Sequence, residues 1–234
     1  MSLSLPTIAA IETSTELASV ALLCGDRLLS RESSGAQTHS MTVLALLQAL
    51  LREQELTLAQ CDALAFGSGP GSFTGVRTAC GLAQGLAFGA NLPVVPVVTL
   101  LAMADAARTQ GAGDNIIAVL DARMGEVYWA QYCFDEQWDI VSEPCLSAPE
   151  QVITDEASCA VGNGLAAYAD RFTALRSARR LPEVMPHASQ IALLGRQFAQ
   201  HGQGVHAREA QPLYLRNKVA LTTAERTAAR GAGA

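Results

Sequence analysis

Apolar and polar positions near the start of the chain follow a pattern that predicts strands joined by tight turns. Apolar runs occupy 7–11 and 18–24, and a run at 27–33 alternates between apolar and polar residues. The polar stretch Glu12–Thr15 separates the first two runs, and the turn pair Gly25-Asp26 separates the second from the third. Runs bounded by turn residues in this way predict three consecutive antiparallel strands.

Longer apolar patterns follow, and they predict helices that alternate with short strands. We expect strands at 63–67 and 94–98, and helices at 40–53, 74–88 and 100–108. A glycine-rich turn at 68–72 leads from a strand into the second of these helices.

The same order of elements begins again after the glycine-rich joint Gly111-Ala112-Gly113. An apolar strand ends at Asp121, as the first strand of the chain ends at Glu12, and two further strands are expected after it, at 127–134 and 138–142. The remaining predicted elements are a short strand at 160–161, a helix from Gly162-Asn163-Gly164 through Phe172, and a helix at 189–201. This repetition predicts an α/β protein with two similar βββαβα halves.

Two such halves facing each other form the duplicated architecture of actin, Hsp70 chaperones and sugar kinases. We therefore expect an N-terminal actin-like subdomain at 1–110, a C-terminal one at 111–220 and a flexible tail at 221–234.

Composition narrows the classes of function. The chain has 234 residues, of which 50% are hydrophobic and 16% charged, and its formal net charge is −6. The low charged fraction hints at surface hidden by a partner. A protein that holds nucleic acid alone usually carries a basic face, and here only Arg176, Arg179 and Arg180 cluster, in what we interpret as a solvated helix end. We therefore expect any contact with nucleic acid to be shared with a partner.

Sequence features of metal sites and membrane proteins are absent. None of the six cysteines forms a C-x-x-C pair, and the four histidines lack H-x-x-x-H spacing, so we expect no metal site. Glu12 interrupts the N-terminal apolar run, which argues against a signal peptide. No stretch approaches the roughly 18 apolar residues of a membrane span. We expect a cytoplasmic protein that does not contact membranes.

Two segments invite a phosphate-binding interpretation. Hydroxyl residues after an acid, as in Glu12-Thr13-Ser14, let backbone N–H groups approach an anion, but they also suit a hairpin turn with local hydrogen bonds. The glycine-rich segment Gly67–Arg77 precedes a helix N-terminus, where an anion can bind. It lacks the lysine of a P-loop, so a capped strand-to-helix turn is the structural alternative. Both readings stay open.

The helix after the glycine-rich turn carries an unusual stripe. Gly81, Gly85 and Gly89 recur every four residues and so share one side of the helix. Each mid-helix glycine costs about 1 kcal/mol relative to alanine, and very close backbone packing is the usual compensation. The preceding helix carries leucines on more than one face. Together the two helices predict a helix-on-helix protein interface, with packing inside this chain as the alternative.

The motif G-P-G-S-F-T-G-V-R at 69–77 is highly specific. Four weaker motifs accompany it, namely I-E-T-S at 11–14, T-H-S at 38–40, D-A-R at 121–123 and P-L-Y-L-R at 212–216. Through these motifs, which occur in the expected order, the chain resembles the TsaB (YeaZ) family of bacterial proteins for threonylcarbamoyladenosine biosynthesis on tRNA.

The resemblance implies an actin/Hsp70-like fold and a non-catalytic scaffold role. The expected partners are TsaD, the catalytic subunit that transfers threonylcarbamoyl to the adenosine beside the anticodon (position 37) of tRNAs reading ANN codons, and the ATPase TsaE. The first two helices would contact TsaD, or a second copy when the chain is alone. Carried over, the interface comprises Met41, Leu44, Leu47, Leu51, Thr78, Gly81, Gly85 and Gly89.

The resemblance also bears on cofactors and on other classes of function. It places ATP or ADP and the metal on the partner subunits, with none bound by this chain alone. Vestigial phosphate or nucleotide contacts would fall on Glu12, Thr13, Ser14, Gly162, Asn163 and Gly164. A stand-alone phosphotransferase or ATPase of the sugar-kinase architecture is the alternative function. A metallopeptidase is a weaker one, because the chain lacks the metal ligands.

Overall fold

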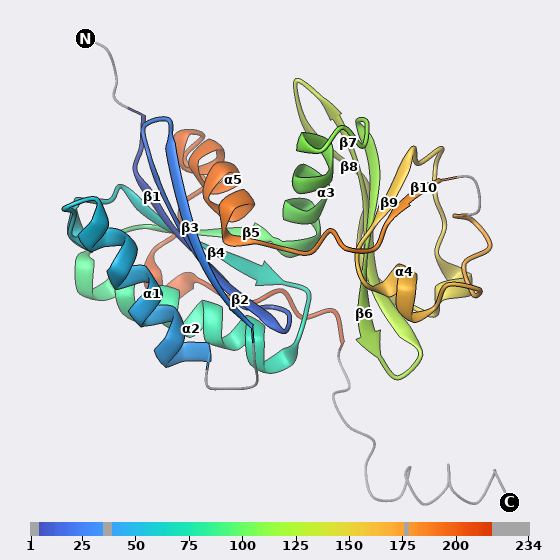
Figure 1. Cartoon of the computed structure of the whole chain (residues 1–234), viewed down its shortest axis with the longest axis horizontal. Coiled ribbons are helices and arrows are strands. Elements are labelled where there is room, and N and C mark those ends of the chain that lie inside the picture. The colour runs from blue at the N-terminus through green and yellow to red at the C-terminus, as the bar shows by residue number, and fades with distance from the viewer. Residues whose placement is uncertain (1–4, 35–38, 176–177, 217–234) are drawn as a thin grey trace, which may run out of the picture.

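The computed structural model describes residues 5–34, 39–175 and 178–216, which form two five-stranded sheets with helices (Figure 1). The first sheet has the order β3-β2-β1-β4-β5 and the second the order β8-β7-β6-β9-β10. The strands of the first sheet are β1 (Ile8–Glu12), β2 (Leu17–Cys24), β3 (Arg27–Ser34), β4 (Ala63–Gly69) and β5 (Val94–Val98). Those of the second are β6 (Asn115–Arg123), β7 (Glu126–Asp135), β8 (Gln137–Ser147), β9 (Cys159–Val161) and β10 (Arg179–Leu181).

Strand pairing repeats between the two sheets. In the first, β1 runs antiparallel to β2 and parallel to β4; in the second, β6 runs antiparallel to β7 and parallel to β9. The outer strands follow the same rule, since β3 and β8 are antiparallel and β5 and β10 are parallel to their neighbours. The duplicated fold predicted from the order of elements is confirmed.

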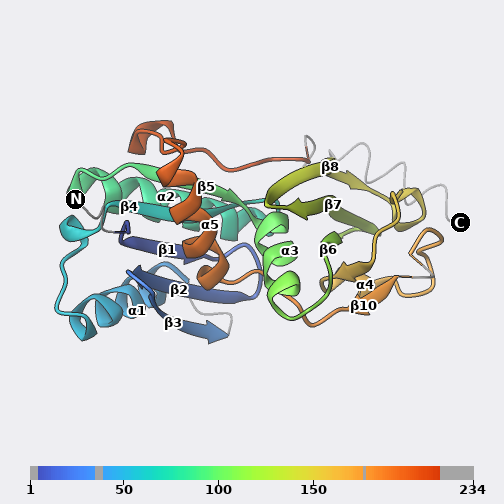
Figure 2. The same ribbon diagram turned by 90° about the horizontal axis from the view of Figure 1, so that it is seen from above.

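Helices cover both faces of the first sheet (Figure 2). One face carries α1 (His39–Glu53) and α2 (Phe73–Ala90), while α3 (Thr99–Thr109) and α5 (Ala188–Gln200) lie between the two sheets. Eight of the 11 residues of α3 are buried, which explains its apolar, alanine-rich sequence. Among the described residues, no helix is long and apolar enough to cross a bilayer.

The two central helices are exchanged between the halves. Helix α3 follows the first sheet in sequence but packs on β6 and β7, whereas α5 follows the second sheet but packs on β1, β2 and β4. The expected division at residue 111 therefore separates the strands of the two sheets, but helix α5, inside the range 111–220, packs on the first sheet. A core shared by both sheets favours this exchange, because it buries the apolar faces of both helices.

Three details of the second half differ from the sequence-based expectations. The helix expected from Gly162-Asn163-Gly164 through Phe172 is a single turn, α4 (Gly164–Ala167), because the chain turns at Tyr168 and places the hydroxyl of this residue on Asp121. Strand β8 is longer than the expected 138–142. Arg179 and Arg180 lie on strand β10, so their interpretation as a helix end was wrong. Arg176 and the predicted tail at 221–234 lie outside the described residues.

Candidate functional site

The polar turn after β1 and the glycine-rich turn before α2 are packed against each other. The backbone N–H of Ser72 donates to the carbonyl of Ser14 at 2.7 Å, and the hydroxyl of Thr13 donates to the carbonyl of Gly75 at 2.7 Å. A β-carbon at Gly71 would lie 2.6 Å from the Ser14 carbonyl oxygen. The glycines of this turn therefore allow two backbone segments to meet.

Glu12 ends β1 with a fully buried side chain. Its carboxylate accepts a hydrogen bond from the backbone N–H of Ser14 at 2.5 Å and one from the Thr99 hydroxyl at 3.4 Å. Burial raises the pKa of Glu12 above its ordinary value, and these hydrogen bonds oppose that rise only in part. Glu12 is therefore enclosed by the protein and faces no open space in which it could hold a metal–phosphate group.

A polar cleft of about 390 Å³ lies between the ends of the two sheets. Ser14 and Ser72 line it from the first half, and Asp121, Tyr128 and Asn163 from the second. The hydroxyl of Ser14 is buried and has no hydrogen-bond partner among the described residues. The cleft is thus where the two halves present polar groups to each other.

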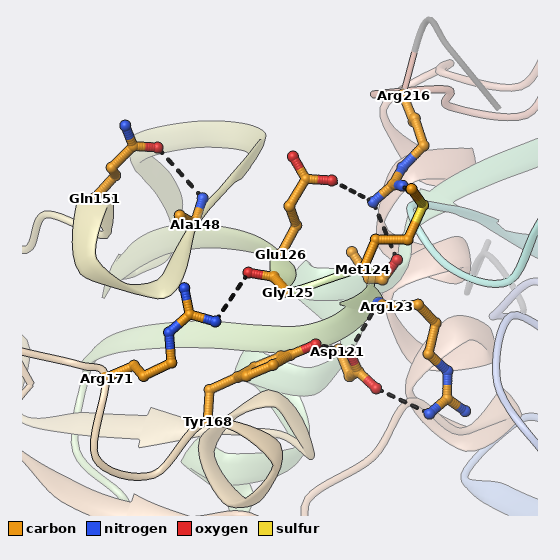
Figure 3. A network of polar contacts seen from close by, with 11 residues as sticks. Asp121, Arg123, Met124, Gly125, Glu126, Ala148, Gln151, Tyr168, Arg171 and Arg216 are labelled. Atoms are coloured by element: carbon orange, nitrogen blue, oxygen red, sulfur yellow. Dashed lines mark hydrogen bonds and ion pairs between the residues drawn. The ribbon is translucent and has the colours of Figure 1, made fainter. Parts of the chain in front are cut away.

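Ion pairs occupy the wall of this cleft (Figure 3). Arg123 contacts Glu16 at 2.7 Å and Asp121 at 3.0 Å, so it joins the two halves. Arg216 contacts Glu126 at 2.6 Å and also donates to the carbonyl of Ala122 at 3.1 Å. Each arginine already has a carboxylate partner, which leaves little positive charge for an anionic ligand.

The residues expected as vestigial nucleotide contacts do not form one constellation. Glu12 and Thr13 are buried away from the cleft, while Ser14 and Asn163 line it. Asn163 accepts a hydrogen bond from the backbone N–H of Asp121 at 2.9 Å. Gly162 and Gly164 are buried against the backbone of β6, where a β-carbon would overlap Val119. These glycines therefore serve packing.

No group of three or more histidine, cysteine, aspartate or glutamate side chains in the described part of the chain could hold a metal ion. All six cysteines are free thiols. The geometry therefore offers neither a metal centre nor a thiolate pair for catalysis among these residues.

A second surface of interest is formed by α1 and α2. Met41 is 75% exposed and Phe88 76% exposed, although both side chains are apolar. The three glycines of the stripe, Gly81, Gly85 and Gly89, are all exposed to solvent. A β-carbon added at any of them would meet no atom within 4 Å. The glycine stripe therefore faces outward, and the alternative that these glycines pack only inside this chain is wrong.

Two members of the predicted interface lie elsewhere. Leu47 and Leu51 are 2% and 8% exposed and belong to the core between α1 and the first sheet. Helix α1 must cover this sheet with one face, and these two leucines lie on that face. Met41, Leu44 and Thr78 remain at least partly exposed on the two helices.

Sequence reasoning missed an aromatic cluster at the N-terminal end of the same helix. The guanidinium of Arg77 lies 3.6 Å from the ring centre of Phe73 and 5.4 Å from that of Tyr214. Its Nε donates to the Tyr214 hydroxyl at 2.6 Å. Phe73 and Arg77 are four residues apart, in the same row as Gly81, which is the one sequence signal that could have revealed the cluster.

Comparison with known proteins identifies the family. The family model described as TsaD, tRNA N6-adenosine threonylcarbamoyltransferase, matches residues 33–223. The tRNA threonylcarbamoyladenosine biosynthesis protein TsaB of Haemophilus influenzae is 40% identical over 226 residues, covering 91% of this chain and 94% of its own. TsaB of Escherichia coli is 38% identical over 222 residues, with 91% and 96% covered.

A solved structure agrees with these relatives. YeaZ from Pseudomonas aeruginosa superimposes with a TM-score of 0.84 at 36% sequence identity, over 90% of this chain and 100% of that one. A second crystal structure from Pseudomonas aeruginosa, of an uncharacterized protein with similarity to peptidase YEAZ, superimposes with a TM-score of 0.85 at the same identity and coverage. The chain therefore belongs to the TsaB (YeaZ) family of tRNA threonylcarbamoyladenosine biosynthesis proteins.

Proposed function

We propose that this chain is a non-catalytic subunit that binds the catalytic subunit TsaD and activates threonylcarbamoyl transfer. The acceptor would be the adenosine beside the anticodon of tRNAs that read ANN codons. The observation that carries the proposal is the outward-facing surface of α1 and α2, which we call the helical face. It comprises Met41, Leu44, Ala45, Gln48, Thr78, Gly81, Gly85, Phe88 and Gly89.

The chemistry of the helical face suits a protein partner. No charged residue other than Arg77 occurs in α2, and α1 has none before Arg52. The face carries two apolar side chains that are about three-quarters exposed, Met41 and Phe88, and a glycine stripe where an added β-carbon would meet no atom within 4 Å. A partner helix can come unusually close to a glycine stripe, and burial of Met41 and Phe88 would add apolar area.

The interior cleft supports a non-catalytic role. In a sugar-kinase-like enzyme, the acid of the first hairpin meets the metal and the phosphates, but Glu12 is fully enclosed. The two arginines at the cleft are each paired with carboxylates. On this proposal ATP or ADP and the metal belong to TsaD and the ATPase TsaE, and tRNA meets this chain only within the complex.

The same helical face would pair with a second copy when TsaD is absent. Because one surface cannot serve both partners, homodimer and TsaD complex would compete. The stand-alone phosphotransferase remains the second candidate, since the cleft between the two halves is polar and lies where that architecture binds nucleotide.

A reconstituted transfer reaction tests the proposal. Unmodified tRNA, purified TsaD, TsaE and ATP would be supplied with threonylcarbamoyl adenylate, with and without this chain, and the modified nucleoside would be measured by mass spectrometry. We expect sustained product only when the chain is present. Equal product without the chain would contradict the proposal. Product from this chain and the adenylate without TsaD would show that the chain is itself catalytic.

A further inference from the structure

A second cavity, of about 590 Å³, lies at another junction of the two halves. It is bounded by the end of β5, the start of α3 and the end of α5 on one side, and by β7 and β8 on the other. Its volume falls within the range of roughly 300–1,000 Å³ that is typical of small-molecule sites. Most of its walls are apolar, formed by Val98, Leu101, Trp138, Ile140, Phe198 and Leu213.

Tyr132 lines this cavity and carries an unsatisfied polar atom. Its side chain is 1% exposed, and its hydroxyl has no hydrogen-bond partner among the described residues. A buried polar group without a partner typically costs about 1–3 kcal/mol. Burial, and then the charge of Glu143, raise the pKa of Tyr132, so the group remains a neutral hydroxyl. The residue that carries this unpaired donor and acceptor thus lines the cavity.

The other polar groups of the cavity are mainly acceptors. Glu143 lines it with a carboxylate, and no ion pair to Glu143 forms within the described parts of the chain. His201 uses its Nδ1 to donate to the Gln197 carbonyl at 2.8 Å, which leaves Nε2 as an acceptor when the ring is neutral. Among the residues that the structure describes, no lysine or arginine lines the cavity.

We propose that this cavity is a binding site for a small organic cation with an aromatic or other apolar body. The apolar walls would enclose the body, and the ring of Trp138 suits stacking or contact with a cation. The ammonium group would face Glu143 and satisfy the Tyr132 hydroxyl. The carboxylate of Glu143 would repel an anion of the same shape, and none of the described lining residues is a lysine or arginine that could compensate. The site should therefore prefer cations to anions.

Tryptamine and 3-indolepropionate provide a matched pair of probes, because both carry an indole but opposite charges at neutral pH. Binding to the full chain would be followed by ¹H–¹⁵N chemical-shift changes during titration. We expect tryptamine to bind at least about tenfold more tightly than 3-indolepropionate, with shifts concentrated at Leu101, Tyr132, Trp138 and Phe198. Equal affinity, or shifts elsewhere on the molecule, would overturn the proposal.

Variants separate a ligand site from a general attraction of cations to an acidic protein. Glu143→Gln should weaken tryptamine about fivefold, while Asp139→Asn, on the same strand but outside the cavity, should change it less than about twofold. Equal effects of the two variants on tryptamine affinity would show that the overall negative charge of the protein attracts the ligand, and would refute the site.

The Tyr132→Phe variant tests the unsatisfied hydroxyl directly. Without ligand, the variant should unfold at the same temperature as wild type or a higher one, because it removes an unpaired polar atom. It should also bind tryptamine at least about threefold more weakly. A lower unfolding temperature with unchanged tryptamine affinity would show that the hydroxyl is held by a structural water, and would overturn its role in binding.

Discussion

Thr13 and Gly75 are held together by a hydrogen bond, and their backbones lie so close that no side chain fits at position 75. The Thr13 hydroxyl donates to the Gly75 carbonyl at 2.7 Å, and a β-carbon at Gly75 would overlap the Thr13 carbonyl oxygen. The packing of the polar turn after β1 therefore depends on the first turn of α2, and the reverse is also true. Gly75 belongs to the motif at 69–77, the most specific motif of the chain, and in this region the motif serves to pack two backbone segments together.

Two glycines of the same helix should respond to alanine in opposite ways. Gly75→Ala should lower the free energy of unfolding by about 2–3 kcal/mol, because the obstacle is backbone that cannot rotate away. Gly81→Ala, where a β-carbon meets open space, should raise it by up to about 1 kcal/mol through helix propensity. Urea unfolding measures both.

Protein concentration must be low enough for the chain to be monomeric, since a dimer contact at Gly81 would mask the gain. Sedimentation velocity would establish this condition for each variant. Equal stability changes in the two variants, of whichever sign, would contradict the packing assigned to Gly75.

Glu12 should make stability depend on pH. A carboxyl whose folded-state pKa is raised binds its proton more tightly in the folded chain, so its contribution to stability falls as pH rises above the ordinary value of 4.5. Glu12→Gln keeps an acceptor for the Ser14 N–H and cannot ionise. The variant should therefore gain stability relative to wild type as pH rises, until the folded-state pKa is passed.

Urea unfolding of wild type and Glu12→Gln at pH 5, 6, 7 and 8 gives this difference directly, because the other titrating groups cancel. A difference that stays constant over this range, or that shrinks as pH rises, would show that the folded-state pKa is not raised.

The two cleft arginines should differ in their importance for stability. The side chain of Arg216 is 15% exposed, and it bonds both Glu126 and the Ala122 carbonyl, whereas that of Arg123 is 73% exposed. Exposed ion pairs contribute roughly 0–1 kcal/mol, and more enclosed, doubly bonded groups contribute more. Arg216→Ala should lower the free energy of unfolding by about 1–3 kcal/mol, and Arg123→Ala by less than about 0.5 kcal/mol.

Thermal unfolding at two salt concentrations checks this ranking. The small loss in Arg123→Ala should vanish in 1 M salt, and most of the loss in Arg216→Ala should persist. If Arg123→Ala is the more destabilised variant, the bridge from Arg123 to Glu16 is a main contact between the halves.

The isolated chain should not turn over nucleotide. Because Glu12 is enclosed and the cleft arginines are paired, we expect no ATP hydrolysis above background with Mg²⁺ present, and no saturable ADP binding below about millimolar concentration. Isothermal titration calorimetry and phosphate release measure these. Hydrolysis that Asp121→Asn abolishes would instead support the stand-alone phosphotransferase.

The order of elements was predictable because it depends on local patterns. Apolar runs such as 18–24, bounded by turn residues, predicted the strands, and their repetition after residue 111 predicted the second sheet. The four-residue spacing of Gly81, Gly85 and Gly89 predicted a shared side of α2, and this side is exposed.

The features that were missed depend on tertiary contacts. Which sheet α5 covers is decided by the shared core, and nothing in its own sequence distinguishes the two sheets. Leu47 and Leu51 look like Leu44 in sequence, and only the position of the first sheet makes them core residues. Arg179 and Arg180 form a strand through pairing with β9, against their polar character.

The affinity of TsaD for Gly85→Leu tests the central proposal most directly. Position 85 has open space in this chain, so the variant should fold with at least wild-type stability, which circular dichroism and thermal unfolding would establish. Gln200→Leu, which places the same side chain on an exposed position of α5, is the matched control. We predict that Gly85→Leu weakens TsaD binding at least about a hundredfold in calorimetry, and that Gln200→Leu leaves it unchanged. Wild-type affinity in a folded Gly85→Leu variant would contradict the helical face as the TsaD-binding surface.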